Sequence, residues 1–234
     1  MFSQKDIDTA VKIVKNIHVP YEFGCDADGY FYTDTIVDQL INAGYSDDDF
    51  DIDYGISKVV IIFKNLSFVI KIPFHGKWYD EWDEDYEEYY NKFEPFYCAN
   101  SSNYDDYCEA EVDAINEMIC FGFEAIIAEE ICIGEYNHTL FYIQEKVKKY
   151  NCSTRYTPSY DSLTKARNLK YYYEYCDENW RASVIELYGE EYWTNFVDWV
   201  DNGHNFILND MHDGNYGYNY KGLPVLFDVS GYEG

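Results

Sequence analysis

Two acids and an amide are closely spaced near the end of the chain. Asp210 and Asn215 lie five residues apart in one loop segment, and Asp228 follows thirteen residues later, at the end of the short apolar segment 223–228. Phosphoryl transfer from a nucleotide needs an acid that orients the attacking hydroxyl, and carboxylate and amide oxygens that hold Mg²⁺ against the phosphates. The sequence therefore predicts Asp210 as the orienting acid, and Asn215 and Asp228 as metal ligands.

These segments read DMHDGN and FDVSG. They resemble the catalytic loop and the metal-binding motif of eukaryotic-type protein kinases, including the interval between the two. His212, two places after the acid, is closer to the aminoglycoside and choline kinase branch of that superfamily, and short kinase-like proteins encoded by bacteriophages are also similar. The resemblance implies an α+β, protein-kinase-like fold of two lobes, with ATP and Mg²⁺ as cofactors. We assign His212 no chemistry, because a loop histidine more often braces its loop.

The same resemblance implies site residues further upstream. Lys71, in the segment VIKI, matches the strand lysine that contacts the nucleotide phosphates. Glu111 matches the helix glutamate that holds this lysine, with Glu109 and Glu117 as rivals. The turn over the phosphates falls on 55–59, and the strand that runs into the adenine hinge falls on 141–147, so the resemblance spans roughly residues 50–231. The nucleotide-binding residues that it implies are Gly55, Ser57, Val59, Lys71, Glu145 and Val147.

The chain departs from the kinase pattern at several places. Gly55 is the one glycine of the phosphate turn, where the family usually has three, so that the turn would cradle phosphates less closely. Residues 208–209 replace the His-Arg pair before the catalytic acid, and residues 229–230 replace Phe-Gly. The sequence ends six residues past Asp228, without the segments that bind peptide substrate in protein kinases. The resemblance therefore implies a reduced second lobe. The phosphate acceptor stays open between a serine or threonine of a protein and a small molecule.

The apolar pattern predicts the elements that must position these groups. Helical spacing predicts helices over 7–17, 33–44, 107–121 and 184–203, and short apolar runs predict strands over 59–63, 68–72, 126–133, 140–147 and 223–228. We expect three segments: a helical extension over 1–45, a kinase-like first lobe over 46–147 with a helical insert over 75–107, and a reduced helical lobe over 148–234.

The insert contains the most acidic stretch of the chain. Residues 80–88 hold seven carboxylates in nine positions. Five aromatic residues lie three or four apart, which predicts an amphipathic helix over 78–93 that is aromatic inside and acidic outside. They are Trp78, Trp82, Tyr86, Tyr89 and Phe93. This spacing favours packing over a binding platform, and the acidic side is either a solvated face or a surface for a basic protein partner.

The net charge of −27 restricts the classes of partner. It repels nucleic acid and anionic membranes and attracts basic surfaces, so we expect neither direct nucleic-acid binding nor membrane binding. A solubilising surface, a docking face for a basic protein and mimicry of nucleic-acid phosphates all stay open. The alternative to an enzyme is therefore a catalytically inactive, kinase-like binder that inhibits a basic or nucleic-acid-binding host protein. The resemblance to bacteriophage proteins implies a phage origin for such a binder.

The location expected from the sequence is a cytoplasm, by resemblance a bacterial one. The longest apolar run, 59–63, is too short to span a bilayer, and no secretory leader opens the sequence. Seven scattered cysteines without a CxxC pair indicate reduced thiols.

Each site residue also has a simpler interpretation. Asp210, Asn215 and Asp228 are residue types that favour turns, and Lys71 could reach solvent from an edge strand. Geometry discriminates between the interpretations. An enzyme requires Lys71 within salt-bridge reach of Glu111, and requires the three loop residues to converge on one cleft.

Overall fold

The computed structural model describes residues 2–25, 33–55, 57–83, 86, 88–95, 107–149, 178–202 and 215–228. The chain divides into two compact units, each with a hydrophobic core of its own. Unit 1 comprises Met1–Val112 and Glu129–Glu145, and unit 2 comprises Asp113–Ala128 and Lys146–Gly234. The predicted α+β class is confirmed. None of the helices in the described ranges is long and apolar enough to cross a membrane.

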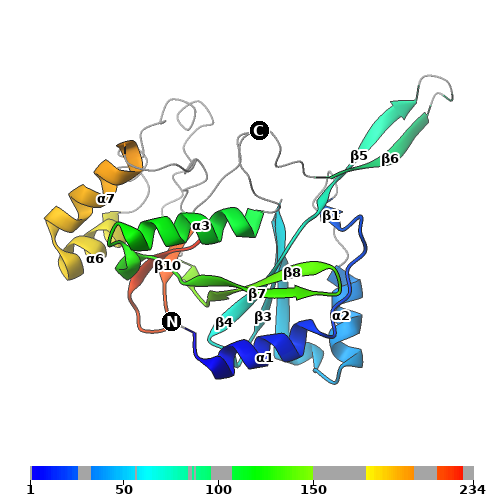
Figure 1. The fold of residues 1–234 in the computed structure, drawn as a ribbon, viewed down its shortest axis with the longest axis horizontal. Coiled ribbons are helices and arrows are strands. Elements are labelled where there is room, and N and C mark those ends of the chain that lie inside the picture. The colour runs from blue at the N-terminus through cyan, green and yellow to red at the C-terminus, as the bar shows by residue number, and fades with distance from the viewer. Residues whose placement is uncertain are drawn as a thin grey trace. The chain divides into compact units, whose positions relative to one another are not determined.

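Unit 1 is built on an antiparallel sheet of five strands in the order β2-β3-β4-β8-β7 (Figure 1). The strands are β2 (Phe50–Tyr54), β3 (Lys58–Phe63), β4 (Phe68–Pro73), β7 (Glu130–Tyr136) and β8 (Thr139–Glu145). The two strands expected at 59–63 and 68–72 are confirmed, and the pair expected at 126–133 and 140–147 is present with shifted bounds. Asn137 and His138 join β7 to β8 with φ of 52° and 66°, as a two-residue hairpin turn requires.

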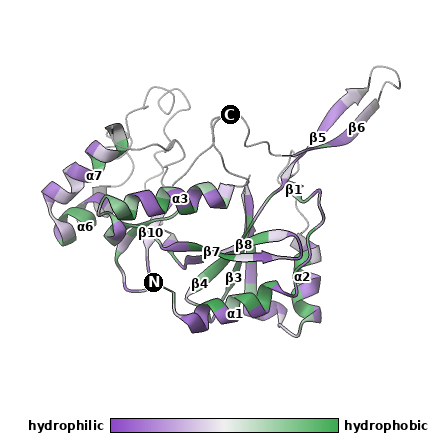
Figure 2. Ribbon diagram, in the orientation of Figure 1, coloured by the Kyte–Doolittle hydropathy of each residue, from purple (hydrophilic) through white to green (hydrophobic). Residues whose placement is uncertain are grey.

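One face of this sheet forms the core of unit 1 together with two helices, α1 (Gln4–Val14) and α2 (Thr33–Asn42). Ile13 and Leu40 from the helices pack with Ile61 and Ile70 from the strands. Figure 2 shows hydrophobic residues along α1 on one side and hydrophilic residues on the other. Both helices were predicted. They share the core of the sheet, however, instead of forming a separate extension over residues 1–45.

The acidic insert is a β-hairpin, so the prediction of a helix over 78–93 within a helical insert is wrong. Strand β5 (Gly76–Asp83) pairs with β6 (Glu88–Pro95), and the short β1 (Gly24–Cys25) pairs with β5. A spacing of four residues fits the period of a strand as well as that of a helix. Trp78 therefore faces Phe93 across the hairpin, with ring centroids 5.2 Å apart, and Trp82 faces Tyr89 at 4.9 Å.

The described part of unit 2 contains helices and a small sheet. Helix α3 (Tyr107–Cys120) is confirmed, beginning in unit 1 and continuing in unit 2. The single helix expected over 184–203 is wrong: α6 (Glu178–Tyr188) ends at Gly189, whose φ of +92° stops the helix, and α7 (Glu190–Asn202) follows. The sheet pairs β9 (Lys148–Lys149), β10 (Tyr216–Tyr218) and β11 (Pro224–Leu226), the last confirming the strand expected near 223–228. Short 3₁₀ turns occupy Asp47–Asp49 in unit 1 and Glu124–Ile126 in unit 2.

Candidate functional site

Lys71 lies in the middle of the sheet of unit 1, on the face opposite the hydrophobic core. Strand β4 has β3 on one side and β8 on the other, so the interpretation of Lys71 as an edge-strand lysine is wrong. Its chain neighbours Ile70 and Ile72 are both part of the core. Because side chains alternate along a strand, Lys71 points to the other face.

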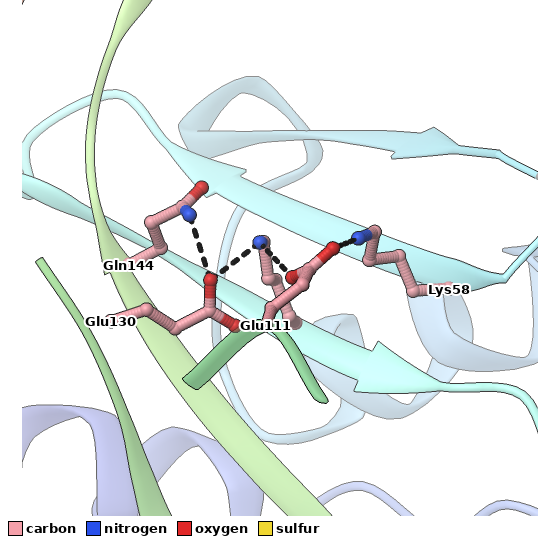
Figure 3. A network of polar contacts seen from close by, with 5 residues as sticks. Lys58, Glu111, Glu130 and Gln144 are labelled. Carbon is pink, nitrogen blue, oxygen red and sulfur yellow. Dashed lines mark hydrogen bonds and ion pairs between the residues drawn. The ribbon is translucent and has the colours of Figure 1, made fainter. Parts of the chain in front are cut away.

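The ammonium group of Lys71 contacts two carboxylates. Its Nζ lies 2.7 Å from Oε2 of Glu111, on α3, and 2.6 Å from Oε2 of Glu130, the first residue of β7 (Figure 3). The predicted contact between Lys71 and Glu111 is thus confirmed, in preference to Glu109 and Glu117 as its helix partner. The contact with Glu130 was not predicted.

A second lysine binds the same helix glutamate. Lys58, the first residue of β3, contacts Oε1 of Glu111. Val60 pairs directly with Lys71, so Lys58, two residues before Val60, lies on the same face of the sheet. Gln144 completes the group by donating a hydrogen bond from Nε2 to Oε2 of Glu130, at 2.7 Å.

We refer to Lys58, Lys71, Glu111, Glu130 and Gln144 as the lysine–glutamate cluster. Every member is at most 5% exposed, and the cluster includes two ammonium groups and two carboxylates in contact. Burying such charges costs free energy that their attraction only partly returns, so ion pairs of this kind are weak contributors to stability. Oε1 of Glu130 also has no hydrogen-bond partner among the described residues, which adds to the cost. Stability alone therefore explains the cluster poorly.

Cys108 lies beside the cluster. Its Sγ and a carboxylate oxygen each of Glu111 and Glu130 all lie within 4.8 Å of one another. Burial, together with the charge of Glu111, raises the pKa of the Cys108 thiol, so the thiol is neutral near pH 7. A metal ion there would also have to compete with two ammonium groups for the carboxylates. The arrangement suits ion pairs better than a metal centre.

The predicted phosphate turn joins β2 to β3. The Gly55 amide donates to the carbonyl of Lys58 at 3.0 Å, and the Ser57 carbonyl accepts from Phe74 at 2.9 Å. A Cβ added at Gly55 would meet no atom within 4 Å, so the turn itself does not require glycine. Val59 is fully buried in the core, on the face opposite Lys71, which contradicts the expectation that its side chain shares a nucleotide site with that lysine. Val59 had been named because the resemblance places the phosphate turn on 55–59.

The predicted hinge coincides with the boundary between the two units. Glu145 ends β8, and its amide donates to the carbonyl of Glu129 at 2.8 Å. The chain enters unit 2 at the next residue. Val147 belongs to unit 2, where its side chain would lie 2.6 Å from a Cβ added at Gly217. Adenine binding by this segment stays a prediction.

Asn215 and Asp228 lie at the same end of a two-stranded ribbon in unit 2. Asn215 immediately precedes β10, Asp228 follows β11 by two residues, and Tyr216 pairs with Leu226. The pairing extends one step further, because the Phe227 amide donates to the Asn215 carbonyl at 2.9 Å. The ribbon therefore brings together two residues that are thirteen positions apart in the sequence.

The backbone at Asp228 has a conformation that is uncommon for a residue other than glycine. Its φ is 63°, in the left-handed region. Aspartate tolerates this conformation in turns, so the backbone at Asp228 is compatible with a turn residue as well as with a metal ligand. Asn215 is buried. Asp210 and His212 lie outside the described residues.

The core of unit 2 fixes the strand that carries Asn215. Trp180, on α6, is completely buried and donates from Nε1 to the Gly217 carbonyl at 3.3 Å. Its ring lies 5.2 Å from that of Tyr216. Gly217 in turn lies so close to the Lys148 carbonyl that a Cβ would collide with it. These contacts hold β10 between α6 and β9.

A separate surface pocket of about 580 Å³ lies in unit 1, lined by α1 and the turn after β3. Lys12, Tyr45, Phe63 and Leu66 are among the residues that line it. None of the residues that the sequence singled out takes part, so this pocket has no connection with the lysine–glutamate cluster.

Comparisons with known protein families, with curated proteins and with solved structures find no match for this chain. A function is therefore inferred from the motifs and from the geometry of the described residues.

Proposed function

We propose that the chain is an ATP- and Mg²⁺-dependent phosphotransferase of protein-kinase-like architecture. The observation that carries the proposal is the ion pair between Lys71, on the central strand β4, and Glu111, on α3. The two residues are forty positions apart in the sequence, and the resemblance to kinase motifs predicted their contact. In the proposed enzyme Lys71 contacts the nucleotide phosphates, and Glu111 holds the ammonium group in place.

The ribbon of unit 2 supplies the ligand types that magnesium prefers. Asn215 offers an amide oxygen and Asp228 a carboxylate, and both are hard oxygen donors. Their approach at one end of β10 and β11 supports the assignment of both as metal ligands. Magnesium held there would offset negative charge on the phosphates. Asp210 is assigned the orientation of the attacking hydroxyl by resemblance.

In this proposal the hinge follows Glu145, where the chain passes from unit 1 to unit 2. In this proposal Gly55 and Ser57 cover the phosphates, and the backbone from Glu145 to Val147 meets adenine. The acceptor is a serine or threonine of a protein, or a small molecule.

The proposal is tested by phosphate transfer from ATP with Lys71→Met. The wild-type chain is expected to release ADP in the presence of Mg²⁺, and the variant to do so about 10²–10³-fold more slowly, because one cation that stabilises the transferring phosphate is removed. Lys77→Met, which removes an exposed lysine of the same unit, serves as the control. Equal rates for the two variants and the wild type would overturn the assignment of Lys71.

The β5–β6 hairpin favours a second candidate function, the capture of a lysine- and arginine-rich segment of a protein partner. Residues 76–95 contain eight acidic and two basic residues. Both lysines are already paired within the hairpin, Lys77 with Glu94 at 3.5 Å and Lys92 with Glu81 at 2.7 Å. The acidic residues of this segment outnumber its lysines by six (eight less two), and Figure 2 shows a largely hydrophilic β5.

Exposed aromatic rings accompany these carboxylates on the hairpin. Trp82, Tyr86, Tyr89 and Tyr90 are between 43% and 77% exposed, which is unusual for large rings. A cation over such a ring is attracted to its face, and Lys92 already lies over Tyr79 at 5.8 Å from the centroid. Carboxylates and exposed aromatic rings both attract cationic side chains, so together they suit a lysine- and arginine-rich peptide. Mimicry of nucleic-acid phosphates is a narrower form of this hypothesis and stays a prediction.

Peptide binding to the hairpin can be measured with a fluorescent arginine-rich peptide. Replacing both Trp82 and Tyr89 with serine is expected to weaken binding about tenfold, because two aromatic contacts of about 1 kcal/mol or less each are lost without a change in net charge. Tyr220→Ser, at an exposed tyrosine of unit 2, is the matched control. An unchanged dissociation constant for the double variant would show that the hairpin rings do not bind the peptide.

A further inference from the structure

Glu111 is shared by two lysines that stand on neighbouring strands. Figure 3 shows Lys58 on one side of Glu111 and a second ammonium group on the other side. This second ammonium group is that of Lys71, and it also contacts Glu130. The two carboxylate oxygens of Glu111 are divided between them: Oε1 contacts Lys58, and Oε2 contacts Lys71. One helix residue thus orients two cations on one face of the sheet.

Lys58 also belongs to the turn that the proposed function places over the phosphates. It comes three residues after Gly55, and its carbonyl closes the turn by accepting from the Gly55 amide. Because Val59 points into the hydrophobic core, Lys58 is directed to the face that Lys71 occupies. A cationic side chain therefore stands where the phosphate turn meets the sheet.

We propose that Lys58 is a second phosphate-binding lysine and that Lys58 and Lys71 hold the phosphates of one nucleotide together. This inference rests on the proposed phosphotransferase function. An ammonium group is a compact charge that donates to phosphate oxygens from several directions. The turn has a single glycine and so offers phosphates a looser backbone cradle, and the Lys58 side chain compensates for it. Glu111 positions both ammonium groups, while Glu130 also accepts from Lys71 and is itself held by a hydrogen bond from Gln144.

The test compares the binding of ATP·Mg²⁺ with that of adenosine, which has no phosphates, by titration calorimetry. In Lys58→Met, affinity for ATP·Mg²⁺ is expected to fall about tenfold or more, because a charged hydrogen bond is lost, while affinity for adenosine is unchanged. Lys77→Met, which removes an exposed lysine of unit 1, should leave both affinities as they are. Circular dichroism without ligand establishes that each variant is folded.

The outcomes separate this inference from the proposed function. A wild-type chain that binds neither ligand overturns both. If the wild type binds ATP·Mg²⁺ more tightly than adenosine and Lys58→Met does so to the same degree, the phosphate-binding role of Lys58 is overturned, but the proposed function is not. A parallel loss of both affinities would mean that Lys58 is only structural, and would also overturn it.

A second measurement needs no substitution and so does not depend on the folding of a variant. An acyl-phosphate derivative of ATP acylates amines that lie next to bound phosphates: the lysine nitrogen attacks the acyl carbon, and the nucleotide phosphate leaves. After digestion and mass spectrometry, label is expected on Lys58 as well as Lys71, and excess ATP should suppress it. Label on Lys71 without Lys58 would contradict the proposal.

Discussion

Replacement of Glu111 by alanine is expected to lower the free energy of unfolding by about 3–5 kcal/mol, because it removes a buried carboxylate that contacts two buried lysines. Lys58 and Lys71 both contact this one carboxylate, and both are nearly inaccessible to water. After the substitution Lys71 retains its contact with Glu130, while Lys58 and Lys71 each lose the carboxylate of Glu111. Urea unfolding followed by far-ultraviolet circular dichroism measures the loss.

Asp113→Ala is the matched control, since Asp113 lies on the exposed side of the same helix. It is expected to change the free energy of unfolding by no more than about 0.5 kcal/mol. Glu111→Gln keeps the shape and removes only the charge, so its loss should approach that of the alanine variant. If Glu111→Ala lowers the free energy of unfolding no more than Asp113→Ala does, the contacts of Glu111 with Lys58 and Lys71 do not stabilise the fold.

Asp228→Asn is expected to reduce phosphate transfer about 10²–10³-fold and to abolish its dependence on Mg²⁺. The substitution preserves the size of the side chain and removes the charge that the proposed metal requires. Asparagine also tolerates the left-handed backbone conformation that Asp228 adopts, so the fold of the ribbon should be unaffected. The measurement is ADP release as a function of Mg²⁺ concentration.

The control for this variant is Asp198→Asn, at an exposed position of α7 in the same unit. It makes the same chemical change away from the ribbon and is expected to leave the rate and the Mg²⁺ dependence unaltered. An Asp228→Asn variant with the wild-type Mg²⁺ dependence would exclude Asp228 as a metal ligand.

The sequence predicted those parts of the site in which a charged residue interrupts an apolar strand. Lys71 stood out because a lysine in an otherwise apolar strand has to find a carboxylate, and the resemblance named Glu111 for it. Lys58, Glu130 and Gln144 carry the same signal, since each is a polar residue at or within an apolar strand. Lys58 was missed because the expected strand began one residue after it, at Val59. Glu130 and Gln144 lay inside expected strands, but the resemblance gave neither residue a role.

Each error in the fold has its own physical origin. Residues four apart share a face on a helix and also on a strand, so the aromatic spacing from Trp78 to Phe93 did not distinguish the two. Cross-strand pairing of aromatic rings decided in favour of the hairpin. At Gly189 the apolar pattern continues without interruption, and only the left-handed backbone divides α6 from α7. The position of Asn215 beside Phe227 depends on the register of β10 and β11, which spacing alone does not supply.

The measurement that tests the central claim most directly is thermal unfolding of the wild-type chain with ATP and Mg²⁺, compared with unfolding in the absence of nucleotide. A ligand that binds only the native state raises the midpoint by mass action. The account predicts a rise at millimolar ATP that requires Mg²⁺ and disappears in Asp228→Ala. No shift at millimolar nucleotide would contradict the phosphotransferase proposal and leave the acidic hairpin as the feature to pursue.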